Sequence, residues 1–240
     1  MAYAAGVRID VWSDLVCPFC HIGRRRLELA LEQFEHADDV EVIWHSYELD
    51  RNAPAVDETP VIDSLVSRYG RSRDELEAQH EHMAREAADA GLTFSWRELV
   101  TGNSYDAHRL IHYARSVGME EPVTRALMRA WYTDGAALGD HAVLQRLAVG
   151  AGLDAYAVAA LLASDDFGID VRTDEAMAAQ IGISAVPTFV FDQKYAVQGA
   201  QSVPVLLGAL QQVWDERDVA PTPAEDGCGA CACGSGGCGR

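Results

Sequence analysis

The chain has 240 residues, of which 49% are hydrophobic and 23% are charged. This length and composition are typical of a globular protein with a sizeable core, either a single domain or a small domain with a large insertion. The formal net charge of −18, from 37 acidic and 19 basic residues, disfavours a surface that binds nucleic acid or an anionic membrane.

The N-terminal sequence, MAYAAGVRID, has no basic segment followed by an apolar run. No stretch of the chain approaches the roughly 18–20 apolar residues of a membrane span. We therefore expect a cytoplasmic protein with neither nucleic acid nor membrane as a partner. Because cytoplasmic thiols are mostly kept reduced, a cysteine pair there is more often catalytic or metal-binding than a permanent disulfide.

The first predicted elements are a strand and a helix on either side of the stretch DLVCPFCH. Residues 7–14, VRIDVWSD, are rich in Val and Ile and predict a buried strand. Pro18 suits the first turn of a helix. The apolar residues that follow recur on one helical face, namely Ile22, Leu27, Leu31 and Phe34. This pattern puts Cys17 at the N-terminus of a helix that follows a central strand.

Cys17 and Cys20 have a spacing that suits half of a zinc site, a structural disulfide or a redox-active pair. The free N–H groups and the positive end of the helix dipole favour a thiolate at Cys17, which is the attacking form in thiol–disulfide exchange. Cys20, one turn further on, is placed to resolve a mixed disulfide. A zinc site needs two further ligands nearby. The strand–CxxC–helix context favours the redox pair, with both cysteines catalytic.

The rest of the ordered sequence predicts a thioredoxin-like α/β frame, β-α-β at the front and β-β-α at the back. A second strand lies within residues 41–50, two more within 186–199, and a closing helix follows. The intervening region has no convincing strand, and its helices have predicted caps at Asp140 and Asp154 and a predicted stop at Gly182. We expect an all-helical insertion there. The predicted divisions are 1–55 for the front half with the CxxC motif, 56–183 for the helical insertion, 184–217 for the back half and 218–240 for a flexible cysteine-rich tail.

The stretch SDLVCPFCHIG, residues 13–23, resembles the active site of DsbA-like thiol oxidoreductases, in particular the FrnE-like branch. That branch is grouped with 2-hydroxychromene-2-carboxylate isomerases and kappa-class glutathione transferases. The resemblance continues through GNSYDAHRLIHYA, RAWYTDGAALGD and IGISAVPTFVFDQKYAVQGAQ. It implies a thioredoxin fold with a helical insertion, with Cys17 as the nucleophile and Cys20 as the resolving cysteine.

The resemblance also implies two groups of substrate-binding residues. Val186 and Pro187 match the cis-proline loop that faces the CxxC motif, where the Val186 backbone can pair with an extended substrate segment. The alternative is a proline at the entrance of a strand. Asn103 and His108 match a family stretch that can line a cleft between the helical insertion and the frame. Alternatively, Asn103 or Ser104 caps a helix and His108 makes a hydrogen bond in the core.

Two functions from different classes remain open. The first is a thiol–disulfide oxidoreductase that acts on protein thiols and disulfides, requires no bound cofactor and exchanges electrons with glutathione or a thioredoxin-type partner. The alternative is a glutathione-dependent isomerase or transferase of small aromatic molecules. Those enzymes usually carry serine where this chain has Cys17, so the cysteine pair favours the first. A binding or chaperone module is a third interpretation, and a homodimer is compatible with all three.

The C-terminal stretch PTPAEDGCGACACGSGGCGR is glycine-rich and holds four of the six cysteines, Cys228, Cys231, Cys233 and Cys238. A segment of this composition cannot bury a core. It is interpreted as a redox arm, as a zinc site of four thiolates, or as a tail without a function. The resemblance to FrnE-like proteins that carry a C-terminal cysteine pair points to Cys233 and Cys238 as the pair that exchanges with Cys17 and Cys20.

Overall fold

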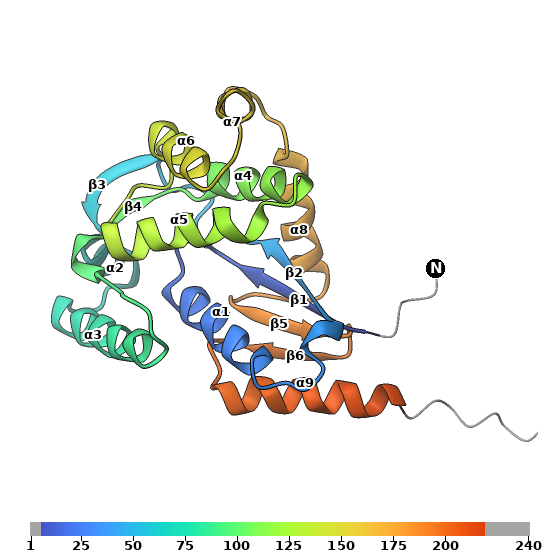
Figure 1. The fold of residues 1–240 in the computed structure, drawn as a ribbon. Helices are drawn as coiled ribbons and strands as arrows, with labels where there is room; N and C mark the ends of the chain where they lie inside the picture. Colours follow the sequence, from blue (N-terminus) through green and yellow to red (C-terminus); the bar gives the residue numbers. More distant parts are fainter. Residues whose placement is uncertain (1–5, 219–240) are drawn as a thin grey trace, which may run out of the picture.

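The computed structural model describes residues 6–218, which form a four-stranded sheet, a second two-stranded sheet and the helices around them (Figure 1). The four-stranded sheet has the order β2-β1-β5-β6, in which β1 and β2 are parallel and the other neighbours are antiparallel. Its strands are β1 (Val7–Ser13), β2 (Val40–Ser46), β5 (Thr188–Phe191) and β6 (Tyr195–Gln198). The predicted β-α-β and β-β-α halves of a thioredoxin-like fold are confirmed.

The helices run through the whole described part of the chain and are densest between β2 and β5. They are α1 (Pro18–Leu31), α2 (Val61–Tyr69), α3 (Arg73–Asp89), α4 (Tyr105–Ser116), α5 (Glu120–Asp134), α6 (His141–Gly150), α7 (Ala155–Leu162), α8 (Gly168–Gln180) and α9 (Val203–Asp218). None of the helices within residues 6–218 has both the length and the apolar character needed to cross a membrane.

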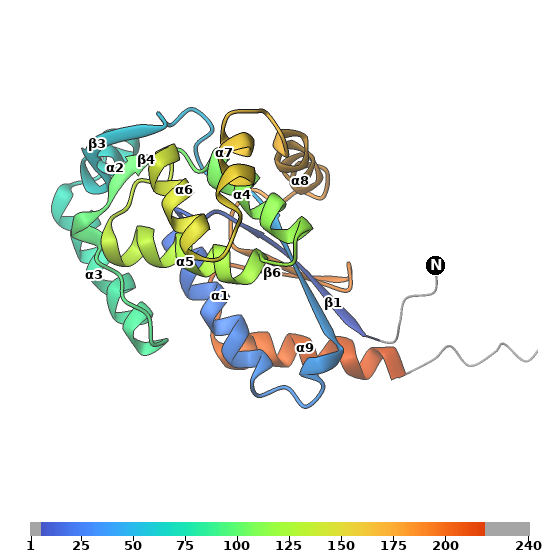
Figure 2. The same cartoon turned by 45° about the horizontal axis from the view of Figure 1, so that its top comes forward.

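Strand β1 is buried on both faces because helices cover the sheet from two sides. Val7, Ile9 and Val11 alternate along the strand and pack in one core with residues of α1 and α9, which lie side by side (Figures 1 and 2). Trp12 points to the opposite face, where its indole Nε1 donates a hydrogen bond of 2.9 Å to the carbonyl oxygen of Asp174 in α8. Val7, Ile9 and Val11 on the face toward α1 and α9 account for the apolar residues that mark the strand in the sequence, whereas Arg8, Asp10 and Trp12 alternate onto the other face.

The region between the two halves has its own hydrophobic core, built mainly from α3, α4, α5, α6 and α7. The Asp140 carboxylate caps α6 by accepting from the backbone N–H groups of Ala142 and Val143, and the Asp154 carboxylate accepts from the N–H of Ala157 at the start of α7. Gly182 has a φ of +80° just after α8. The two predicted caps and the predicted stop are therefore confirmed.

The prediction that this insertion is entirely helical is wrong in one detail. Strands β3 (Val56–Pro60) and β4 (Val100–Gly102) pair antiparallel and form the second sheet. Both strands are short, with five residues in β3 and three in β4, and the residues of β3 alternate between exposed and half-buried. The two strands pair only when segments about 40 residues apart in the chain come together on folding. Local sequence pattern therefore does not predict this sheet.

Arg24 also departs from the amphipathic pattern of α1, which places it on the solvent side. The residue is buried, and its guanidinium lies 4.7 Å from the centre of the Trp44 ring. Its carboxylate partners are Glu28 and Glu121. Helix α1 is thus covered by the insertion as well as by α9, whereas helical periodicity describes only one apolar face.

Candidate active site around Cys17 and Cys20

Cys17 stands where the segment after β1 turns into α1. Its backbone is extended, with φ −90° and ψ 113°, and Pro18 opens the helix. The Cys17 carbonyl oxygen accepts from the backbone N–H groups of Cys20 and His21, at 2.9 and 3.2 Å. No side chain of the described residues caps this helix end. The first N–H groups and the positive end of the helix dipole are therefore available to stabilise a thiolate at Cys17.

Cys20 lies one turn into α1 and is fully buried. Its Sγ atom accepts a hydrogen bond of 3.5 Å from the backbone N–H of Asp14. Burial, together with the neighbouring Cys17 thiol, raises the pKa of Cys20 well above its ordinary value. Both cysteines are free thiols in this structure. The pair is therefore asymmetric, with Cys17 beside an open helix end and Cys20 held as a protonated thiol in the interior.

The loop before β5 faces the CxxC motif. The Cys17 Sγ atom lies 3.7 Å from the carbonyl oxygen of Val186, and the Val186–Pro187 peptide bond is cis. Helix α1 approaches this loop closely at Gly23, where an added Cβ would lie 3.0 Å from Cγ of Pro187. The structure thus brings Val186 and Pro187 next to the nucleophilic position. Their role in binding substrate stays a prediction.

His108 and Asp14 meet beneath the CxxC loop. The Nε2 atom of His108 lies 3.4 Å from Oδ1 of Asp14, and both side chains are buried. The Asp14 carboxylate also accepts from the backbone N–H groups of Leu49, at 2.7 Å, and of Val16, at 3.3 Å. The Asp14 carboxylate therefore connects the CxxC loop to the segment after β2. His108 brings the helical insertion close to the same carboxylate.

Asn103 makes the contacts of a helix-capping residue. Its Oδ1 atom accepts from the backbone N–H of Tyr105 at 2.7 Å, and its Nδ2 atom donates to Oε1 of Glu48 at 3.3 Å. Its neighbours Gly102 and Ser104 line the cleft beside Cys17, whereas Asn103 is not among the lining residues. A direct contact of Asn103 with substrate stays a prediction.

A cleft of about 510 Å³ opens beside Cys17. The CxxC loop and the Val186 loop form one side of it, and α2, α3 and the segment before β4 form the other. Its deeper lining is mostly apolar and includes Leu65, Leu76, His80, Met83, Phe94 and Trp131. The sequence does not predict that α2 and α3 line this cleft, because neither helix carries a motif that links it to a cysteine 40 or more residues earlier. Among the lining residues, the sequence pointed to Cys17 and Val186 as site residues.

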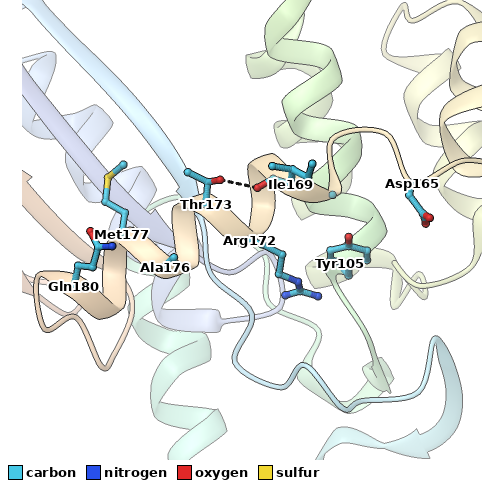
Figure 3. Close-up of a pocket in the computed structure, with 9 residues that line it drawn as sticks. Tyr105, Asp165, Ile169, Arg172, Thr173, Ala176, Met177 and Gln180 are labelled. Carbon is cyan, nitrogen blue, oxygen red and sulfur yellow. Dashed lines mark hydrogen bonds between the residues drawn. The ribbon is translucent and has the colours of Figure 1, made fainter.

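A second cavity, of about 560 Å³, lies on the surface along α8 (Figure 3). The guanidinium of Arg172 lies 4.4 Å from the centre of the Tyr105 ring at one end of it, and Met177 and Gln180 lie at the other. Neither Cys17 nor Cys20 lines this cavity. The chemistry of the thiols therefore belongs to the first cleft.

A protein metal site needs several His, Cys, Asp or Glu side chains close together. Within residues 6–218, no group of three or more His, Cys, Asp and Glu side chains is arranged to hold a metal ion. The predicted accessory cysteines, Cys228, Cys231, Cys233 and Cys238, lie outside the described residues.

Comparisons with known proteins agree with this geometry. The chain is 39% identical to a probable DsbA oxidoreductase from Streptomyces coelicolor, with a TM-score of 0.86 over 96% of this chain and 100% of that one. It is 27% identical to the uncharacterized protein YwbO of Bacillus subtilis, over 77% of this chain and 86% of YwbO. A 2-hydroxychromene-2-carboxylate isomerase shares the fold at 16% identity, with a TM-score of 0.62 over 88% of this chain and 98% of that one.

The family model described as the DSBA-like thioredoxin domain matches residues 8–211, which include both halves of the frame and the helical insertion. The resemblance expected from the CxxC motif is confirmed at the level of the family. The chain belongs to the DSBA-like thioredoxin domain family.

Proposed function

We propose that this protein is a thiol–disulfide oxidoreductase that exchanges disulfides with protein substrates through Cys17 and Cys20. The observation that carries the proposal is the asymmetry of the two free thiols. Cys17 lines a cleft at an open helix N-terminus, while Cys20 is buried and its pKa is raised. Cys17 is itself only 4% exposed, so the cleft is the route by which a substrate sulfur reaches it, whereas Cys20 stays shielded as the resolving thiol.

In the reducing direction, the Cys17 thiolate attacks one sulfur of a substrate disulfide. The substrate S–S bond breaks, and the departing sulfur takes up a proton. Cys20 then loses its proton and attacks the Cys17 sulfur, which releases the second substrate thiol and forms the Cys17–Cys20 disulfide. Two electrons pass to the substrate, and glutathione or a thioredoxin-type dithiol would restore the reduced pair. The reverse sequence oxidises a substrate dithiol.

Insulin reduction with the two single-cysteine variants tests this proposal. We expect Cys17→Ser to abolish reduction and Cys20→Ser to accumulate a mixed disulfide at Cys17, visible as an added mass that dithiothreitol removes. A variant with Cys228, Cys231, Cys233 and Cys238 changed to serine together leaves the CxxC pair intact and separates the contribution of the tail from that of Cys17 and Cys20. Full activity of Cys17→Ser would refute the assignment.

A glutathione-dependent isomerase of small aromatic molecules is the second candidate. The mostly apolar cleft beside Cys17 favours it, because about 510 Å³ is within the range of roughly 300–1,000 Å³ that small-molecule sites occupy. Isomerisation needs no resolving thiol. Turnover of 2-hydroxychromene-2-carboxylate with glutathione, unchanged in Cys20→Ser, would support this candidate against the oxidoreductase.

Three further features are part of the proposal. The protein is proposed to act in the cytoplasm, which cell fractionation tests. The tail cysteines are proposed to exchange with the CxxC pair, with zinc binding as the rival role. Stoichiometric zinc in the reduced full-length protein, lost in the variant with four tail serines while exchange kinetics stay unchanged, would establish the rival. No bound cofactor is proposed for the exchange itself. A homodimer is also proposed, and the molecular mass of the protein in solution tests it.

A further inference from the structure

His80 brings a hydrogen-bonding group into the cleft beside Cys17. The residue lies on α3, is 4% exposed and belongs to the cleft lining. Its Nδ1 atom lies 2.8 Å from the carbonyl oxygen of Leu76. Since a carbonyl oxygen only accepts, Nδ1 carries the hydrogen. In the neutral ring, Nε2 is then an acceptor.

His80 lines the cleft, and Nε2 is the ring nitrogen that remains for a group that enters there. This Nε2 atom makes no hydrogen bond with residues 6–218, and it is not fully enclosed by protein atoms. Burial lowers the pKa of His80, which keeps the ring neutral near pH 7. The rings of Phe94 and Trp96 lie beside it, with centres 6.2 and 5.6 Å away. A fixed acceptor thus sits in aromatic and apolar surroundings.

The surroundings restrict which donor can reach this acceptor. A lysine ammonium would lose its hydration against Leu76, Met83 and Phe94. The two arginines at the cleft are already bonded, Arg68 to Asp50 and Arg71 to Gln79, so they add little attraction for a free acid. A serine or threonine hydroxyl has too little apolar surface to fill the space. An aromatic group that carries its own donor meets both requirements, because its ring is apolar and its O–H or N–H needs a partner when buried.

We propose that the cleft is a subsite for an aromatic side chain with a hydrogen-bond donor, above all tyrosine, next to the substrate cysteine that reacts with Cys17, and that His80 Nε2 accepts its hydroxyl hydrogen. This inference rests on the proposed oxidoreductase function and adds its substrate class. It makes His80 a specificity residue, because the imidazole contacts the substrate away from the sulfur atoms that react.

The test compares short peptide disulfides that differ only beside the cysteine, where tyrosine, phenylalanine or O-methyltyrosine is placed before or after it. We expect kcat/KM of the wild type to be about 3- to 10-fold higher for the tyrosine peptide than for the other two, because only tyrosine donates. Equal rates for the three peptides at both positions would overturn the subsite while leaving the oxidoreductase function in place. No reaction with any of them would remove the function and the subsite together.

A variant on α3 tests His80 itself. His80→Phe keeps an aromatic ring and removes the acceptor, so the ratio of the tyrosine rate to the phenylalanine rate should fall to about 1. The matched control is His82→Phe on the exposed side of the same helix, which should keep the wild-type ratio. A wild-type ratio in a folded His80→Phe protein would overturn the role of His80. If His80→Phe does not fold, the O-methyltyrosine comparison in the wild type still decides between the outcomes.

Discussion

The Sγ atom of Cys17 lies 3.7 Å from the carbonyl oxygen of Val186, although 169 positions separate the two residues in the chain. This contact joins the end of the first strand to the loop that opens the back half of the frame. Val186 lines the cleft together with Cys17, so in the proposed function an extended substrate segment pairs with the backbone of Val186 while its cysteine meets Cys17.

The two cysteines should differ strongly in their reaction with iodoacetamide. Cys17 lines the cleft, whereas Cys20 is fully buried and the same burial raises its pKa. We expect native reduced protein at pH 7 to be modified at Cys17 roughly 100-fold faster than at Cys20. Peptide mapping by mass spectrometry, with an unfolded sample as the control, measures both rates. Equal rates in the native protein would contradict the asymmetry of the pair.

Gly23→Ala should disturb the loop that faces Cys17. The added Cβ would lie 3.0 Å from Cγ of Pro187 and 3.2 Å from Cζ of Phe189, so the loop has to move. We expect a loss of about 1–3 kcal/mol in the free energy of unfolding, together with slower disulfide exchange. Gly208→Ala is the matched control, because nothing lies within 4 Å of its added Cβ on exposed α9. That change should stabilise by about 0.5–1 kcal/mol. Similar effects of the two substitutions on denaturant unfolding would refute the close approach at Gly23.

A buried charge network links the sheet to α8 and makes the stability of the protein depend on pH. Both ring nitrogens of His45 lie 2.7 Å from carboxylate oxygens, Nε2 from Asp10 and Nδ1 from Asp174. Burial opposes the charge on His45, but the hydrogen bonds to the two carboxylates outweigh it and raise its pKa. Burial likewise opposes the charge on Asp10 and Asp174, yet their hydrogen-bond partners lower the pKa of each.

The signs of these shifts define the pH range in which the network stabilises. The His45 contribution is complete below its unfolded pKa of about 6.5 and is lost as pH rises through the raised folded value. The carboxylate contribution is complete above about pH 4 and is lost as pH falls. The free energy of unfolding should therefore peak between about pH 4 and 6.5. His45→Gln should lower that peak by about 3–5 kcal/mol and remove the decline above it, whereas exposed His82→Gln should do neither. An unchanged pH profile in His45→Gln would contradict the network.

Arg109 should be essential to the packing of the insertion. Its buried guanidinium donates to the carbonyl oxygen of Leu161 in α7 and to those of Ser164 and Asp166 in the segment after α7. Arg109→Met removes the donor that these oxygens share and leaves those of Ser164 and Asp166 without a partner among the described residues, so we expect a loss of about 3–5 kcal/mol in thermal or denaturant unfolding. The control is Arg125→Met on α5, whose ion pair with Glu121 is exposed and should contribute less than about 1 kcal/mol. A loss below 1 kcal/mol in Arg109→Met would show that the carbonyl groups find other partners.

Local pattern was sufficient for the parts of this protein that a few neighbouring residues decide. Strand β1, the CxxC turn and α1 follow from an apolar run, a proline in the first turn and helical spacing. The caps at Asp140 and Asp154 follow from side chains that bond to their own backbone two or three residues on. The position of Cys17 and Cys20 at the start of α1 was therefore evident from the sequence.

Long-range packing decided the surroundings of those thiols. The wall that α2 and α3 place opposite Cys17, the contact of His108 with Asp14, and the clamp of His45 between Asp10 and Asp174 each join residues distant in the chain. Helical and strand periodicity indicate which positions face an apolar neighbour, but they do not identify that neighbour. The sequence by itself determined the reactive pair and its frame, and only the tertiary structure decided what faces that pair, because the cleft and its acceptor are made by segments that meet after folding.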